Sequence, residues 1–84
     1  MNSTVKITRE EKLLTAALCE LGNFAHKTDV MQTAINTGLS LEHVRRHLRG
    51  IMWDLETGKK IYDDLRRLTL LRTHAVIDSL EKAA

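Results

Sequence analysis

Only three residues, Gly38, Leu39 and Ser40, separate two segments that have the apolar spacing of short helices. Gly38 can end the first helix in the left-handed conformation, and the hydroxyl of Ser40 can cap the second helix. A connection this short forces the two helices to meet at a sharp angle. The sequence therefore predicts a mainly α-helical protein built around this corner.

The size and composition of the chain agree with a single helical domain over residues 1–84. Of its 84 residues, 43% are hydrophobic and 29% are charged, with four glycines and no proline. A chain of this composition can bury a core, so we do not expect disorder. The few aromatic and β-branched residues argue against a β-sandwich or a β-barrel.

An N-terminal helix is expected to begin at Thr8 and to end at Gly22. Thr8 and Glu11 have the spacing of a capping box, in which each side chain accepts a hydrogen bond from a free amide. Leucine and alanine then recur at i, i+3, i+4 and i+7, which gives the helix one apolar side. Gly22 is placed to end the helix, and we expect Phe24 in the following connection to be buried.

The helices on either side of the three-residue link complete a tri-helical core over residues 8–49. The helix before the link is about two turns long and can be capped by Thr28 or Asp29. On the helix after the link, Val44 and Leu48 fall on one side, four residues apart. That side is expected to face the other two helices.

Residues 50–62 fit two structures. In one, Gly50 ends the third helix and a β-hairpin follows, with its turn at Gly58 and with Trp53 packed on the helices. In the other, the third helix continues to Thr57, and Gly50 inside it costs about 1 kcal/mol relative to alanine. We favour the hairpin.

A last helix is expected over residues 63–82, capped by Asp63 or Asp64. It has two apolar sides, of which one can cover the rest of the domain. The other has the a/d spacing of a coiled coil and consists of Leu70, Thr73, Ile77 and Leu80. Because so short a chain leaves it no partner, this second side predicts a homodimer or a different protein partner. The alternative is that the third helix or the N-terminal residues cover it.

The stretch over residues 38–49 (GLSLEHVRRHLR) resembles the turn and recognition helix of winged helix-turn-helix regulators. The usual pattern in that family is Gly-Leu-Ser, three variable residues, Val, two polar residues, His, Leu and Arg. Ala34 is small where the two helices cross, as the corner requires. The likeness covers about residues 8–62, and it departs from the pattern at Thr33, where an apolar residue is usual. The resemblance implies a β-hairpin wing over residues 50–62 and binding to double-stranded DNA.

The outward side of the third helix is the expected DNA-binding surface. Val44 and Leu48 face inward on a helical wheel, Arg45 and His47 lie at the flanks, and the opposite side is basic. An α-helix fits the major groove, where arginine can donate two hydrogen bonds to guanine. The candidate residues on this helix and its cap are Ser40, Glu42, His43, Arg45, Arg46 and Arg49. Lys59 and Lys60, at the turn of the wing, would contact phosphates.

Charge alone does not identify a DNA-binding protein, because the formal net charge is only +2. Residues 41–72, however, carry eight Lys and Arg against five Asp and Glu. The alternative to a DNA-binding surface on the third helix is an ordinary solvated, charged surface.

Other classes of function have little support in the sequence. His43 and His47 are four residues apart, but no further ligand pair accompanies them, so neither a metal nor a cofactor is expected. No nucleophile stands at the spacing of a catalytic motif, so we do not expect an enzyme. The lone Cys19 and the lack of an apolar run of about 20 residues predict a soluble, cytoplasmic protein with no membrane partner.

The sequence therefore predicts a transcriptional regulator that binds double-stranded DNA, with a size that would suit a phage or prophage gene. The alternative is a small protein-interaction module or inhibitor that uses the helix-turn-helix as a scaffold.

Overall fold

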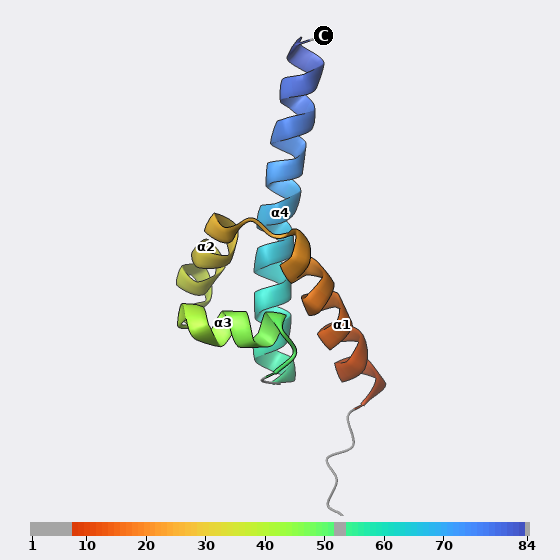
Figure 1. The fold of residues 1–84 in the computed structure, drawn as a ribbon, viewed down its shortest axis with the longest axis vertical. Helices are drawn as coiled ribbons and strands as arrows, with labels where there is room; N and C mark the ends of the chain where they lie inside the picture. Colours follow the sequence, from red (N-terminus) through yellow and green to blue (C-terminus); the bar gives the residue numbers. More distant parts are fainter. Residues whose placement is uncertain (1–7, 52–53, 84) are drawn as a thin grey trace, which may run out of the picture.

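The computed structural model describes residues 8–51 and 54–83, and the bounds below refer to these ranges. Within them the chain forms four helices and no strand: α1 (Arg9–Phe24), α2 (Lys27–Thr37), α3 (Leu41–Leu48) and α4 (Leu55–Ala83). In Figure 1, α4 is the long axis of the molecule, and the three shorter helices lie around its N-terminal half. The mainly α-helical prediction is confirmed.

The predicted β-hairpin wing over residues 50–62 is wrong. Gly50 ends α3 as the hairpin required, with a positive φ of 72° that also rules out a longer third helix. The chain then enters α4 at Leu55 instead of forming strands. Ile61 and Leu65, four residues apart, both point into the core, so the apolar stripe of the last helix continues upstream of its predicted start. Trp53, expected to pack from the hairpin, lies outside the described residues.

The last helix therefore begins at Leu55, eight residues before Asp63 and nine before Asp64, the two caps predicted for it. At its N-terminus the carboxylate of Asp54 accepts a hydrogen bond from the hydroxyl of Thr57. This bond is the main reason why the pKa of Asp54 lies below its ordinary value. An acidic side chain at this position suits the positive end of the helix dipole.

Asp64, by contrast, lies inside α4 and joins it to α2. Its carboxylate accepts hydrogen bonds from the side-chain amide of Asn36, at 3.1 and 3.3 Å, and from Nη2 of Arg67, at 2.9 Å. Burial raises the pKa of Asp64, but the hydrogen bonds from Arg67 and Asn36 outweigh it, so the pKa lies below its ordinary value.

The start of α1 is as predicted, and its end is not. The capping box is present: Glu11 Oε1 accepts from the amide of Thr8 at 3.0 Å, and Thr8 Oγ1 accepts from the amide of Glu11 at 3.1 Å. The helix does not stop at Gly22 but runs on to Phe24. Gly22 instead lies where α1 crosses α3, since a Cβ there would be 3.2 Å from the Cβ of Leu48.

Phe24, predicted to be buried, is 75% exposed. It belongs to the last turn of α1, while Leu21 packs against the core as part of the apolar side that was predicted for this helix. Because the helix runs two residues past Gly22, Phe24 lies on the surface of the helix and not in a connection, so the prediction failed together with the predicted helix end.

The link between α2 and α3 has the predicted geometry. Gly38 is left-handed, with φ of 73°, and the amide of Leu39 donates to the carbonyl of Ala34 at 3.0 Å. The hydroxyl of Ser40 accepts from the amide of His43 at 3.1 Å and so caps α3. In Figure 1, α3 runs across the end of α2 rather than continuing it.

The cap of α2 differs from the prediction, because His26 holds this position instead of Thr28 or Asp29. Nδ1 of His26 accepts a hydrogen bond from the amide of Thr28 at 3.3 Å. Histidine is not among the residues that favour this position, which is why the sequence did not predict it.

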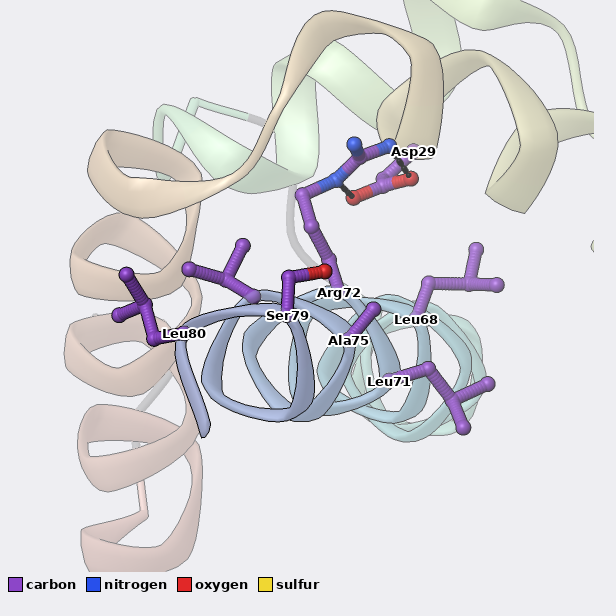
Figure 2. Close-up of a pocket in the computed structure, with 8 residues that line it drawn as sticks. Asp29, Leu68, Leu71, Arg72, Ala75, Ser79 and Leu80 are labelled. Atoms are coloured by element: carbon purple, nitrogen blue, oxygen red, sulfur yellow. Dashed lines mark hydrogen bonds and ion pairs between the residues drawn. The ribbon is translucent and has the colours of Figure 1, made fainter. Parts of the chain in front are cut away.

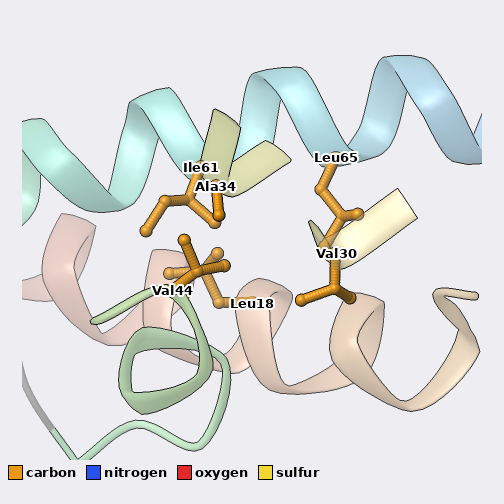
Figure 3. Close-up of a cluster of buried hydrophobic side chains, with 6 residues drawn as sticks. All are labelled: Leu18, Val30, Ala34, Val44, Ile61 and Leu65. Carbon is orange, nitrogen blue, oxygen red and sulfur yellow. The ribbon is translucent and has the colours of Figure 1, made fainter. Parts of the chain in front are cut away.

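The apolar core draws on all four helices, and its buried side chains meet beneath α4, which runs across the top of Figure 3. They are Leu18, Val30, Ala34, Val44, Ile61 and Leu65. Ala34 is buried at the corner of α2 and α3, as predicted for a crossing point. Thr33, where the resembled family has an apolar residue, is also completely buried.

Beyond this core, α4 continues as an exposed helix, whose Arg72 still contacts Asp29 of α2. Every residue over 70–83 is exposed, and we call this segment the arm. At a rise of about 1.5 Å per residue, the arm is about 21 Å long. Even α4, the longest helix in the described ranges, lacks the extended apolar stretch that a membrane crossing requires.

Candidate nucleic-acid interface

Helix α3 divides into an inner and an outer side. Val44 and His47 are buried, with relative exposures of 0% and 1%, whereas Glu42, Arg46 and Arg49 are exposed. His43 and Arg45 are half-buried. They stand directly before and after Val44 in the sequence, so they lie on opposite flanks of the helix. The outer side therefore carries Arg46 and Arg49, and Arg45 lies beside it.

His47 is an inner residue, although the sequence placed it at the edge of the helix. Its Nδ1 donates to the carbonyl of His43 at 3.1 Å, and the two imidazole rings stack with centroids 5.0 Å apart. His43 is thus held against the flank of α3 by its neighbour. No group of three or more His, Cys, Asp or Glu side chains in the described part of the chain could hold a metal ion.

Arg46 lies on the outer side, in the last turn of α3. Its Nε is 3.3 Å from Oε2 of Glu42, and both side chains are about half exposed or more. Together with Ser40 and His43, they line a shallow hollow on the surface. This part of the outer side is close to neutral, because the ion pair cancels its charges.

Arg45 and Arg49 lie on the other flank of α3 and share a second hollow with Lys27, the first residue of α2. The hollow has a volume of about 370 Å³. We call it the basic hollow, and its lining residues are Gly22, Asn23, Ala25, Lys27, Val30, Arg45, Leu48 and Arg49. None of these described lining residues is acidic, so the hollow collects positive charge.

Lys27 was not predicted as a site residue. It stands 18 residues before Arg45, and only the packing of α2 against α3 brings it to this hollow. A single lysine at the start of a helix is no signal in the sequence.

Lys59 and Lys60 do not have the position that was predicted for them. Both lie on α4, because the wing that would have carried them is absent from the described residues. Nζ of Lys59 is 2.9 Å from Oε1 of Glu10 on α1, and Lys60 lines a hollow beside Asn36 and Asp64. The position in a wing, from which these two lysines were predicted to contact phosphates, is therefore wrong.

The predicted partner-binding side of α4 is exposed. Leu70, Ile77 and Leu80 are 43%, 44% and 66% exposed. The hydroxyl of Thr73 donates to the carbonyl of Thr69 at 3.0 Å, inside the same helix. Within the described ranges, α3 does not cover this side, so that alternative is wrong. The other alternative, cover by residues 1–7, falls outside the described residues.

A further hollow of about 620 Å³ lies where the arm leaves the body of the molecule (Figure 2). Its floor contains the small residues Ala75 and Ser79, and its walls contain Leu68, Leu71 and Leu80. The ion pair of Asp29 and Arg72 closes its inner end. The arm therefore has a second apolar side, next to the predicted one.

Within the described residues, these features define the class of protein as a small four-helix protein. Its short α3 carries arginines and is exposed by the sharp corner between α2 and α3. Comparisons with models of protein families, with curated proteins and with solved structures found no match.

Proposed function

We propose that the protein binds double-stranded DNA through the outer side of α3 and acts as a transcriptional regulator. The observation that carries this proposal is the placement of Arg45, Arg46 and Arg49. Arg45 and Arg46 belong to a helix of eight residues whose inner side is anchored in the core by Val44, and Arg49 is the C-terminal cap of that helix. A short helix that is exposed along one side and braced on the other fits the major groove.

The three arginines are suited to different parts of a duplex. Arg46 can donate two hydrogen bonds to a guanine, and Glu42 beside it can accept one from a cytosine. Binding would then replace their mutual ion pair, which is exposed and therefore weak. Arg45 and Arg49, on the flank, are better placed for the backbone, where phosphates attract positive charge without regard to sequence.

We further infer that two copies associate through the arm. A single DNA-binding module buries only about 600–1,000 Å² of protein surface, so a second copy would double a small interface. An isolated helix about as long as the arm is only marginally stable in water. Packing of Leu70, Ile77 and Leu80 against the same residues of a second copy would stabilise it.

A second candidate function rests on the same exposed side of α4. If another protein, rather than a second copy, covers Ile77 and Leu80, the chain is an interaction module or an inhibitor. Such a protein would have little affinity for DNA. The two functions therefore differ in the affinity of the protein for DNA, which is simple to measure.

Binding to pooled random duplexes, followed by fluorescence anisotropy, tests the proposal. A complex with about six phosphate contacts loses about a thousandfold in affinity between about 50 and about 200 mM salt. Replacing Arg45, Arg46 and Arg49 with alanine should abolish this binding while circular dichroism remains unchanged. The matched control replaces three exposed cations elsewhere, Lys12, Arg66 and Lys82, and should retain most of the affinity. Equal losses in both triple variants would contradict a site on α3.

A further inference from the structure

Four basic side chains in the described ranges are held by acidic partners. The nitrogen and oxygen atoms of these ion pairs are 2.8–3.3 Å apart, and the cations are Arg46, Lys59, Arg67 and Arg72. Lys27, Arg45 and Arg49 differ from them, because none of the three forms an ion pair with another described residue. These three cations nevertheless converge on one place, the basic hollow.

The surroundings of the basic hollow leave its positive charge unbalanced. The acidic residues nearest in sequence to the three cations are engaged elsewhere. Asp29 binds Arg72 on α4, Glu42 binds Arg46 on α3, and Asp54 accepts a hydrogen bond from Thr57. The start of α2 at Lys27 adds the positive end of a helix dipole. Like charges that face one hollow repel one another, so an anion bound between them would be stabilised.

The shape of the hollow suits a phosphate group. With a volume of about 370 Å³, it has room for a phosphate and part of the chain that bears it. Two guanidinium groups can each donate paired hydrogen bonds to phosphate oxygens, and a lysine ammonium adds a point charge. Leu48 and Val30 form an apolar wall that a sugar ring could contact.

We propose that Lys27, Arg45 and Arg49 form a binding site for a phosphate group of a nucleic-acid backbone. The inference rests on the proposed function, since it specifies how α3 contacts the phosphate backbone of a duplex. It assigns Arg45 and Arg49 to the backbone and leaves Arg46, with Glu42, to read base edges. It also adds Lys27 on α2, which would fix the orientation of α3 relative to one strand.

The variant that tests the site is Lys27→Ala in the full-length chain, because Lys27 is exposed and lies outside α3. Its affinity should fall by a similar factor for every duplex sequence tested. The slope of log affinity against log salt should become shallower by about one unit, as expected for one lost phosphate contact. Lys12→Ala, with the same change in charge on α1, is the control and should leave the slope unchanged. An unchanged slope in Lys27→Ala, or a loss confined to some sequences, would overturn the proposal.

A second measurement separates the failure of this site from the failure of DNA binding. Inorganic phosphate and pyrophosphate are titrated into the ¹⁵N-labelled protein, and the signals of Lys27, Arg45 and Arg49 are followed by NMR. Shifts that Lys27→Ala removes, in a protein that also binds duplex, support the backbone site. The same shifts without any duplex binding would overturn the nucleic-acid assignment and leave a site for free phosphate. Absence of shifts together with an unchanged salt slope would overturn the site itself.

Discussion

Arg72 on α4 binds the carboxylate of Asp29 on α2 through two hydrogen bonds, from Nε and from Nη2, each 2.8 Å long. Nη2 also donates to the hydroxyl of Thr28 at 3.2 Å. Asp29 is only 8% exposed, so most of the carboxylate is withdrawn from water. The pair joins the first turn of α2 to α4 at the point where the arm leaves the body, as Figure 2 shows.

The stability of the fold should therefore depend on the ionisation of Asp29. The hydrogen bond from Arg72 holds the pKa of Asp29 below its ordinary value. A pKa that is lower in the folded state stabilises the fold above the unfolded pKa, about 3.9, and this contribution is lost as the pH falls through the folded pKa. Asp29→Asn should lower the unfolding midpoint near pH 7 and have a smaller effect at about pH 2, where more of the carboxylate is protonated.

The control for this prediction is Asp78→Asn on the exposed arm, measured by the same thermal unfolding experiments. An equal loss for Asp29→Asn at both pH values would mean that the ionised pair is not the source of the effect.

The backbone at Gly38 should tolerate asparagine better than alanine. Gly38 has φ of 73°, and a Cβ there would meet no atom within 4 Å, so a substitution changes the backbone energy alone. For alanine the left-handed conformation costs about 1–2 kcal/mol, and asparagine adopts it more readily. Urea unfolding should give Gly38→Ala a loss of about 1 kcal/mol and Gly38→Asn a smaller one. Equal losses in the two variants would contradict this explanation of the corner.

The helical register of α4 can be tested at Ile61, which is fully buried. Ile61→Val removes one methylene from the core and should cost about 0.5–1.5 kcal/mol of unfolding free energy. Ile51→Val is the matched control, since Ile51 is 70% exposed, and should stay within about 0.5 kcal/mol of the unchanged protein. A neutral Ile61→Val would place that side chain outside the core.

The arm should control the oligomeric state. Replacing Ile77 and Leu80 with asparagine should convert a dimer into a folded monomer, because both side chains belong to the proposed contact between two copies. Light scattering would report the fall from twice the chain mass of 9.6 kDa to that mass itself. Leu71→Asn, on the other apolar side of α4, should leave the dimer intact. A wild-type protein that is monomeric at all concentrations would exclude association through the arm.

The sequence predicted those parts of the fold that depend on local chemistry. The hydrogen bonds of Thr8 and Ser40 and the left-handed turn at Gly38 involve residues at most five positions apart, so spacing and residue type were sufficient. Gly50 was also predicted correctly as the end of α3 on the hairpin interpretation.

The wing and the end of α1 could not be predicted in the same way. Ile61 alternates with polar neighbours as in a strand, but it also lies four residues before Leu65 as in a helix, and packing against the other helices decides between the two. Gly22 was interpreted as a helix end, whereas its lack of a side chain serves the close approach of Leu48.

The candidate site shows the same division. The directions of Arg45, Arg46 and Arg49 follow from the helical wheel of a single segment: Arg46 and Arg49 are exposed, and Arg45 is half-buried on a flank of α3. The grouping of Arg45 and Arg49 with Lys27 depends on how α2 packs beside α3, and no spacing in the sequence predicts that. The burial of His47 was missed for a similar reason, since the wheel gave its direction but not what lies beside it.

The most direct test of the central claim is an NMR titration of the ¹⁵N-labelled protein with short random duplexes at low salt. If the protein binds DNA through α3, chemical-shift changes will concentrate on the outer side of α3 and at Lys27, and the arm will be little affected. Changes confined to the arm, or no changes at all, would contradict DNA binding through α3.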